Sequence, residues 1–319
     1  MSLAPDARPV RRDVVVTYHY VRPENSDGVT GITPREFDAQ LEAIGRSHRF
    51  VTVDEFAARA AGADPGRDPR PAVLVTFDDA VRDQYEHALP VLTRRAVPAV
   101  FFTPMRPVDP TLDPLNAWTP QHLLHALAQE MGWGDLESRV RREIGRLPIN
   151  ESHMHALYHY ETPAKRWLKY ALAFAIPASR AAETLNAINR GDVKPGPRLR
   201  ASDWFMSCEE LADLQSLGHA LGGHGYDHLP YSTLSPLEQA WDMARASGLM
   251  NRQFGARPRA IAFPFGRRDE ATDELARLFG YTLAFTTDDR VDCKFLEQAI
   301  SGAEASMAAP LITNRERAA

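Results

Sequence analysis

The feature that most constrains the fold is the stretch of residues 72–104, which reads as a strand, a helix and a second strand. Residues 73–75 are apolar and rich in valine, as a strand buried on both faces of a parallel sheet requires. Helical spacing follows between Tyr85 and Leu92, and residues 97–102 begin another apolar run. The stretch therefore predicts a βαβ unit, which is the building block of folds with a parallel sheet.

The first strand of this unit ends on two adjacent carboxylates, Asp78 and Asp79. Side chains alternate between the two faces along a strand, so both acids can reach one centre only where the strand ends and turns. In parallel α/β folds, functional groups collect at the carboxyl ends of strands, which favours a catalytic rim here. The alternative is that the two acids cap and open the following helix, because Asp suits both positions.

A second pair of polar residues, His224 and His228, stands four apart in the glycine-rich residues 217–230. This spacing chelates a metal when it occurs on a helix, but the glycines and Pro230 favour a strand end that runs into a tight turn. The chain has 11 histidines among 319 residues, so the spacing alone is a weak signal. Two acids at one strand end and two histidines at another form the ligand set of a catalytic zinc-type site.

The remaining closely spaced histidines are interpreted as ordinary solvated helix faces. His153, His155 and His159 lie in an apparent helix with glutamates nearby, and no glycine-rich strand end precedes them. His122 and His125 receive the same interpretation.

The two motifs resemble those of the polysaccharide deacetylase family, carbohydrate esterase family four. TFDDA at 76–80 is similar to the family motif TFDDG, and HGYDH at 224–228 is similar to H-[ST]-x-x-H. Further similar stretches follow the family's order and spacing at residues 15–21, 260–266 and 280–287. The resemblance covers residues 14–102 and 207–287, and it implies an α/β fold with a distorted, incomplete (β/α) barrel of seven strands.

The resemblance also implies a role for each motif residue. Asp78 would be the general base, and Asp79, His224 and His228 would hold a divalent metal ion. Zinc is the first expectation for these ligands, and cobalt, nickel and manganese also suit them. Such an ion polarises an amide carbonyl and lowers the pKa of water, whose proton Asp78 would take during attack. Three further residues are expected to contact the oxyanion or the substrate: Phe265, through a nearby backbone N–H, Pro264 and Tyr20.

Several positions depart from the family pattern. Ala80 replaces a glycine, and Gly225 replaces the Ser or Thr whose hydroxyl braces the histidine turn. The third family motif carries an arginine that orients the catalytic aspartate. Its place is taken here by Ala262, which leaves Arg267 or Arg268 as candidate substitutes.

The family's late general-acid histidine is missing, because no histidine follows His228. His19 is the candidate for this role, since it lies where the predicted strand 14–17 ends and a similar Tyr-His pair occurs in a subgroup without the late histidine. The alternative is a partly buried structural histidine that bonds to the backbone.

The pattern predicts a barrel made of residues 1–104 and 206–319, interrupted by a helical insertion or cap at 105–205. Insertions after barrel strands sit at the catalytic face and shape specificity. The aromatic residues of the insertion are therefore candidates for sugar stacking, and the alternative is that they pack its own core. These residues are Trp118, Trp133, Tyr158, Tyr160 and Trp167.

Composition and charge limit the binding partners and the cellular location that we expect for this protein. A net charge of -5 offers no basic footprint for nucleic acid, and no run of about 18 apolar residues predicts a membrane span. The first residues lack the apolar core of a signal peptide, which favours the cytoplasm, or an extracellular location if a leader has been removed. Cys208 and Cys293 are too few for a disulfide framework and are expected to be buried thiols.

The resemblance implies hydrolysis of an N-acetyl group on an acetamido sugar or glycoconjugate intermediate, with release of acetate and a free amine. The partner would be a small-molecule or oligosaccharide substrate, and the sequence leaves the oligomeric state open. Two alternatives remain. One is a related hydrolase of non-sugar amides or formamides, and the other is a carbohydrate-binding protein of the same fold that has lost turnover.

Overall fold

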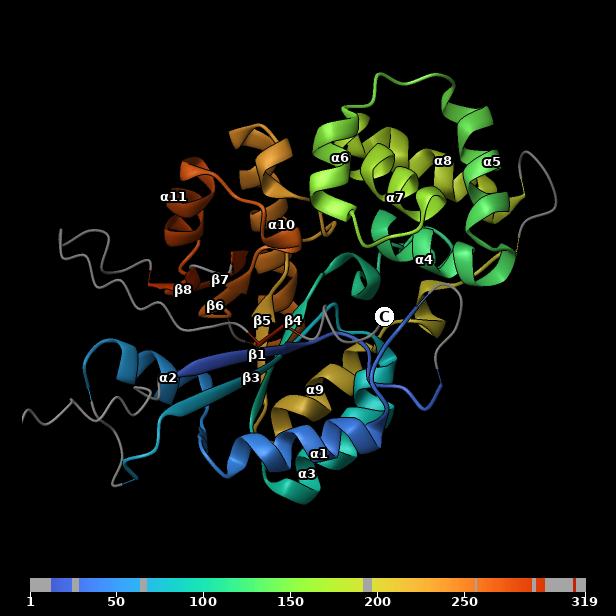
Figure 1. Cartoon of the computed structure of the whole chain (residues 1–319). Coiled ribbons are helices and arrows are strands. Elements are labelled where there is room, and N and C mark those ends of the chain that lie inside the picture. Colours follow the sequence, from blue (N-terminus) through green and yellow to red (C-terminus); the bar gives the residue numbers. More distant parts are fainter. Residues whose placement is uncertain are drawn as a thin grey trace, which may run out of the picture.

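The computed structural model describes residues 13–24, 29–63, 68–191, 197–255, 257–288, 291–295 and 312–313. Its centre is a parallel sheet that curls into an open half-barrel with helices packed around it (Figure 1). No helix among the described residues is both long and apolar enough to cross a membrane. The side chain of Cys293 and most of the tail after Asp288 lie outside the described part.

The sheet follows the order β8-β7-β6-β5-β4-β3-β1-β9, and the short β2 pairs with the start of β3. All neighbouring pairs are parallel except β7 and β8, so seven strands from β9 to β7 run in one direction. The predicted distorted, incomplete barrel is therefore confirmed. The strands are β1 (Val14–Tyr18), β2 (Arg49–Phe50), β3 (Ala72–Asp78), β4 (Ala99–Thr103), β5 (Ala220–Gly223), β6 (Ala260–Ala262), β7 (Leu283–Asp288), β8 (Val291–Phe295) and β9 (Ile312–Thr313).

Helices connect the strands, and several begin at side chains that suit a helix start. Thr33, Thr52, Ser207 and Ser235 each accept a backbone N–H of the first turn in a complete capping box. The helices are α1 (Pro34–Gly45), α2 (Val53–Ala60), α3 (Leu89–Arg95), α4 (Pro120–Met131), α5 (Trp133–Ile144), α6 (Glu151–Tyr158), α7 (Pro163–Tyr170), α8 (Ala178–Arg190), α9 (Cys208–Ser216), α10 (Pro236–Phe254) and α11 (Glu270–Leu278). A π-helical turn, η1 (Gln84–Ala88), precedes α3, and another, η3 (Ala171–Ala175), follows α7.

The central strands are apolar on both faces because both faces are buried in the core. Every residue of β4 is buried, as are all residues of β3 except Asp78 at its end. Phe77 of β3 stacks on Phe101 of β4 with ring centroids 4.9 Å apart, and Tyr18 of β1 lies 5.6 Å from Phe77. This continuous apolar layer fixes the register of the strands and hence the position of their carboxyl ends.

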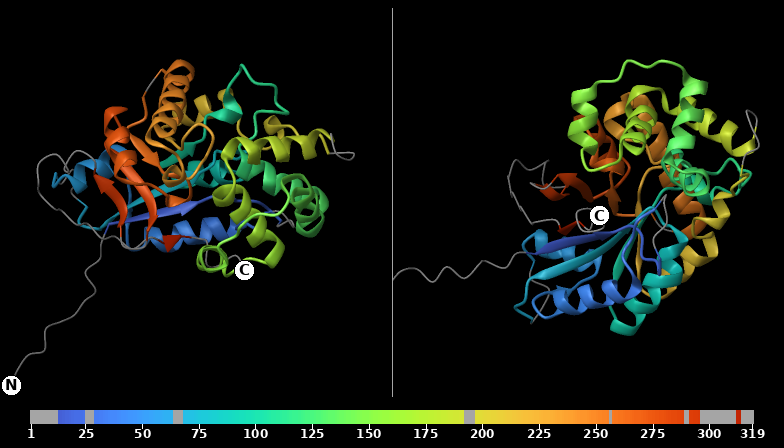
Figure 2. Two further views of the ribbon diagram at one scale, coloured as in Figure 1. Left: turned by 90° about the horizontal axis from the view of Figure 1, so that it is seen from above. Right: turned by 45° about the vertical axis from the view of Figure 1, so that its right-hand side comes forward.

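Helices α4 to α8 fall within the predicted insertion and form a helical group on one side of the sheet (Figures 1 and 2). They have a hydrophobic cluster of their own, which includes Trp118, Tyr158 and Trp167. These three side chains are at most 6% exposed, so they pack the core rather than offering a stacking surface. Trp133 is partly buried against the same cluster, and Tyr160 is 57% exposed.

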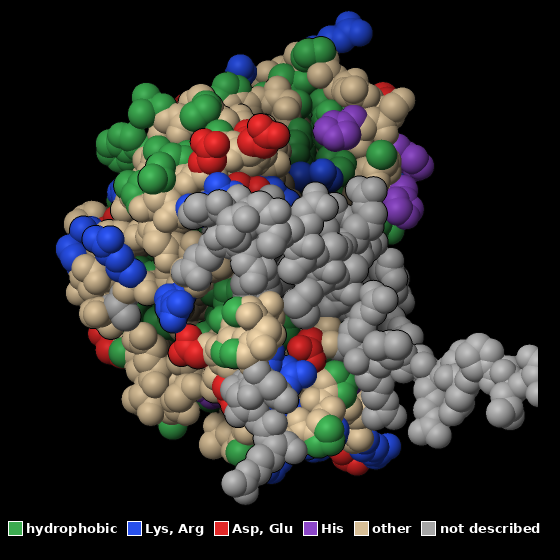
Figure 3. Space-filling model, turned by 90° about the vertical axis from the view of Figure 1, so that its left-hand side faces the viewer, with side chains coloured by type: hydrophobic (Ala, Val, Ile, Leu, Met, Phe, Trp, Pro, Cys, Tyr) green, Lys and Arg blue, Asp and Glu red, His purple; other side chains and the backbone are tan. Residues whose placement is uncertain are grey.

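The histidines of α6 behave as predicted. His153, His155 and His159 are exposed, and histidine side chains gather at one edge of the molecular face in Figure 3. The same interpretation is wrong for His122 and His125 of α4. His122 is only 1% exposed and His125 is half-buried, because α4 packs against both the barrel and the other helices of the insertion.

Candidate active site

The two acids of β3 lie at the end of the strand, where the backbone turns sharply. Asp78 is the last residue of β3, and the next two residues, Asp79 and Ala80, have φ angles of 81° and 52°. This left-handed turn directs the Asp79 carboxylate into the protein, where the residue is 5% exposed. The helix-capping alternative is wrong for Asp79, because its carboxylate faces imidazole rings.

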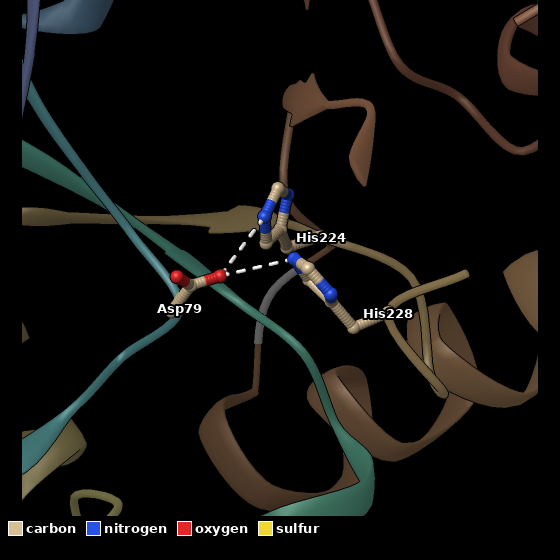
Figure 4. Close-up of side chains that lie close together, drawn as sticks. All are labelled: Asp79, His224 and His228. Carbon is tan, nitrogen blue, oxygen red and sulfur yellow. Dashed lines mark ion pairs between the residues drawn. The ribbon is translucent and has the colours of Figure 1, made fainter. Parts of the chain in front are cut away.

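Asp79, His224 and His228 converge in the way that the motifs imply (Figure 4). The Nε2 atoms of His224 and His228 lie 3.4 and 3.0 Å from Asp79 Oδ1, and all three residues are buried. Asp79 follows β3 and His224 follows β5. These residues reach one point because β4 alone separates the two strands and all three strands run in parallel.

The donor set fits a divalent metal ion. Ligands bound at about 2.0–2.1 Å around a tetrahedral ion are about 3.4 Å apart, close to the distances from Asp79 Oδ1 to the two imidazole nitrogens. His224 Nδ1 lies 2.7 Å from the carbonyl oxygen of Ala262, so Nδ1 carries the proton and the lone pair of Nε2 faces Asp79. Asp79 Oδ1 is buried and accepts no hydrogen bond, which is consistent with a cation between these atoms.

The electrostatics of the cluster favour an ionised Asp79. Burial opposes its charge, but the imidazoles of His122 and His228 outweigh burial and hold the pKa of Asp79 well below its usual value. Burial lowers the pKa of His228 to about 3. For His224, burial acts in the same direction, but the carboxylates of Asp79 and Asp78 outweigh it and raise the pKa. A neutral His228 and an anionic Asp79 are the forms that bind a metal.

The histidine turn is held by a carboxylate rather than by the family's hydroxyl. Asp242 of α10 accepts the backbone N–H groups of Tyr226 and Asp227 at 2.9 and 3.0 Å and the hydroxyl of Tyr231 at 2.7 Å. A Cβ at Gly225 would lie 2.8 Å from Asp242 Oδ2, and Gly225 has a φ of 72°. The departure from Ser or Thr at Gly225 therefore has a physical reason.

His19 lies beside Asp78, as the paired strands predict. The β1–β3 register places Tyr18 opposite Phe77, so the next residues, His19 and Asp78, are neighbours. His19 Nε2 is 3.6 Å from Asp78 Oδ2, and their side chains are 28% and 13% exposed.

A buried glutamine ties these two strand ends together. Gln84 Nε2 donates to the backbone carbonyl oxygens of His19 and Asp78 at 2.7 and 2.6 Å. Gln84 is fully buried in η1, although it belongs to no motif that predicts a site residue. A polar residue among the apolar positions of this helix is the signal that could have found it.

A third imidazole reaches Asp79 from the insertion. His122 Nε2 lies 3.2 Å from Asp79 Oδ2, the oxygen opposite to the one that faces His224 and His228. The His122 ring also lies 5.0 Å from the His228 ring, centroid to centroid. This contact could not be predicted from the sequence, because the pattern of α4 does not show which part of the protein covers its histidine face.

Two of the three predicted substrate-contact residues, Phe265 and Pro264, lie beside the histidine turn. The Phe265 ring lies 5.2 Å from the His228 ring, and Pro264 before it is buried. Tyr20 lines a cavity of about 350 Å³ together with Trp118 and Trp204. Of the two candidate arginines, Arg268 pairs with Asp273 at 2.6 Å and Arg267 is exposed.

A larger groove of about 690 Å³ runs between the insertion and α10. It is lined by η3 residues such as Phe174, by Trp241 of α10, and by Asp227 and Leu229 on either side of His228. Phe174 also contacts Phe265, with centroids 6.3 Å apart. This groove therefore adjoins the histidine turn from the outside.

Comparison with known proteins agrees with this half-barrel fold. The family model "Polysaccharide deacetylase" matches residues 177–284, which include both histidines of the site. YxkH of Bacillus subtilis (strain 168), assigned by name to the polysaccharide deacetylases, is 30% identical over 83 residues, 26% of this chain and 30% of that protein. The chain thus matches less than a third of this relative's length.

Solved structures share the fold. IcaB from Ammonifex degensii has a TM-score of 0.51 at 23% identity, covering 86% of this chain and 84% of that one. The Streptococcus pyogenes deacetylase PplD, solved in complex with acetate, has a TM-score of 0.54 at 16% identity, covering 90% and 88%. The sequence match over residues 177–284 and the shared fold agree with the resemblance to the polysaccharide deacetylases that the motifs show.

Proposed function

We propose that this protein hydrolyses the N-acetyl group of an acetamido sugar or glycoconjugate intermediate in a metal-dependent reaction. The observation that carries the proposal is the convergence of Asp79, His224 and His228, with Asp78 adjacent in sequence and His19 beside it. The family and the acetate in the PplD complex support an acetylated substrate. The barrel at 1–104 and 206–319 would carry the chemistry, and the insertion at 105–205 would wall the site.

Asp79, His224 and His228 would hold the ion, with zinc as the first candidate. When bound, a divalent ion polarises the acetyl carbonyl and makes water more acidic. Asp78 would accept the proton of the attacking water, because it is partly exposed at the strand end. The ion-pair contacts of His224 and His228 are made by Asp79 instead.

His19 would then donate a proton to the departing amine nitrogen as the C–N bond breaks. Its place beside Asp78 allows the base and the acid to serve the same reacting group, and its 28% exposed side chain can reach a bound ligand. A backbone N–H near Phe265 and the Tyr20 hydroxyl would contribute to binding the oxyanion or the sugar. The products are acetate and the free amino sugar.

The proposal is tested with the metal-loaded full chain and short acetamido sugars, by measuring released acetate. Asp78→Asn keeps the size of the side chain but removes the base, so we expect kcat to fall by at least about 10²-fold, the lower end of what acid–base catalysis contributes. Metal binding should be retained, because Asp78 is not in the ligand cluster.

An exposed aspartate far from the site provides the control. Asp135→Asn removes an acid whose partner is Arg139 on the same helix, and it should leave kcat unchanged. Failure of the wild-type protein to release acetate from any acetamido sugar would refute the proposed reaction. Release of formate or of a non-sugar amine in the same panel would instead support the related amide hydrolase, and sugar binding without turnover would support the binding protein.

A further inference from the structure

We propose that His122 of the insertion is a positioning residue that orients the Asp79 carboxylate for metal binding. The inference rests on the proposed function, because it concerns the same metal centre. It gives the insertion a role within the site itself, in addition to covering it.

The two carboxylate oxygens of Asp79 face different partners. Oδ1 faces the Nε2 atoms of His224 and His228, while His122 Nε2 lies 3.2 Å from Oδ2. The ligand atoms within 4.8 Å of one another in the described chain belong to Asp79, His224 and His228, and His122 is outside that group. His122 therefore holds the carboxylate from behind and does not join the ligand set.

The partners of the His122 ring indicate which of its two nitrogens carries the proton. Thr119 Oγ1 lies 2.6 Å from His122 Nδ1, and Thr119 is fully buried. If Nδ1 alone carried a proton, the lone pair of Nε2 would face a carboxylate oxygen at 3.2 Å, which is repulsive. The favourable arrangement has the Thr119 hydroxyl donating to Nδ1 and Nε2–H donating to Asp79 Oδ2.

Thr119 provides an independent sign that this contact matters. It is the N-cap residue of α4, yet its side chain makes no capping hydrogen bond to the helix. Such a cap is typically worth about 1 kcal/mol. The hydroxyl is used instead to fix the His122 ring, as the outer partners of metal sites commonly do for a ligand.

The segment that packs against His122 is attached to the loop that carries Asp79. His122 packs against Phe205 with centroids 4.9 Å apart, and Phe205 forms a β-bridge with Val81, two residues after Asp79. Residues 204 and 206 also hydrogen-bond to residues 82 and 80 through their backbones, at 2.8 and 3.0 Å. The C-terminal end of the insertion is thus attached to the Asp79 loop, and α4 is the insertion helix nearest the sheet (Figure 1).

The test measures metal affinity, by calorimetry or by competition with a chromophoric chelator, using Zn²⁺ and Co²⁺ on the full chain. His122→Ala should weaken binding about 10- to 100-fold, the usual effect of losing an outer partner of a metal ligand. His122→Gln retains an N–H donor and should recover part of this loss. Thr119→Val loses the hydroxyl without losing a cap and should weaken binding several-fold, roughly within the same range.

His125→Ala is the matched control, because it removes another imidazole of α4 that packs against Trp133 and not against Asp79. It should lower stability but leave the metal Kd unchanged. The visible absorption spectrum of bound Co²⁺ should be the same in wild type and His122→Gln, because the number of ligands does not change.

The outcomes separate the two proposals. A wild-type protein that binds neither ion would overturn the metal-dependent function and the role of His122 together. Tight binding by the wild type, with an equal Kd for His122→Ala and Thr119→Val, would overturn only the positioning role. An equal loss in His125→Ala would show that packing of α4, rather than the hydrogen bond to Asp79, supports the site. A changed Co²⁺ spectrum in His122→Gln would make His122 a ligand instead.

Discussion

The structure predicts that a side chain at Gly225 damages the turn between His224 and His228, although the family that the motifs resemble has Ser or Thr there. Gly225→Ala forces a residue with a Cβ to keep a φ of 72°, which costs about 1–2 kcal/mol. Its Cβ would also lie 2.8 Å from Asp242 Oδ2, which must then move. That carboxylate accepts three hydrogen bonds, and bonds to charged groups are worth about 1.5–3 kcal/mol each. Weakening one or two of them adds about 2–4 kcal/mol.

The matched control is Gly255→Ala at the end of α10. Gly255 has a φ of 70°, but a Cβ there would meet no atom within 4 Å, so this variant carries the backbone penalty alone. Urea unfolding of both variants, with the metal removed by a chelator, should show a larger loss for Gly225→Ala. The metal Kd should rise only in Gly225→Ala, because His228 lies in the affected turn. Equal losses of stability in the two variants would refute the bracing role of Asp242.

Two further predictions concern the strand ends and the metal. Gln84→Met removes the two hydrogen bonds to the carbonyl oxygens of His19 and Asp78, so it should lower the free energy of unfolding by about 2–4 kcal/mol in urea titrations and lower kcat. A fully stable and active variant would contradict this. Metal affinity should fall as the pH is lowered, because His224 has a raised pKa and must lose its proton to bind. Below this pKa the Kd should rise about tenfold per pH unit, measured by calorimetry, whereas a Kd that is constant across this range would contradict the assignment of His224.

The convergence of Asp79, His224 and His228 could be predicted from the sequence because the rules of parallel sheets place these residues. Asp79 and His224 each follow a buried strand, and the carboxyl ends of parallel strands share one edge of the sheet. His19 could be placed for the same reason, since β1 and β3 are adjacent. In each case a local pattern identified the strand end, and the topology then brought the residues together.

The residues that hold the site from behind, such as Asp242 and His122, could not be predicted in this way. Helix periodicity does not show what a helix packs against. Asp242, on α10, reads as part of a solvated face, yet it is only 9% exposed beneath the histidine turn. The side chain of His122 has the spacing of an ordinary helix histidine, yet it is buried beside Asp79. Both positions depend on contacts between segments that are distant in sequence.

Gln84, His122 and Asp242 are buried polar side chains. This property distinguishes residues that support the site from residues that support the fold. A buried polar side chain lowers stability unless its hydrogen bonds are satisfied, and an apolar residue would fill most such positions at less cost. Gln84, His122 and Asp242 are all buried, and each contacts a strand end, Asp79 or the turn that carries His224 and His228. Their polarity is therefore better explained by the geometry of the site than by folding. For this reason we expect their replacement to change metal binding or turnover by more than the loss of stability alone would produce.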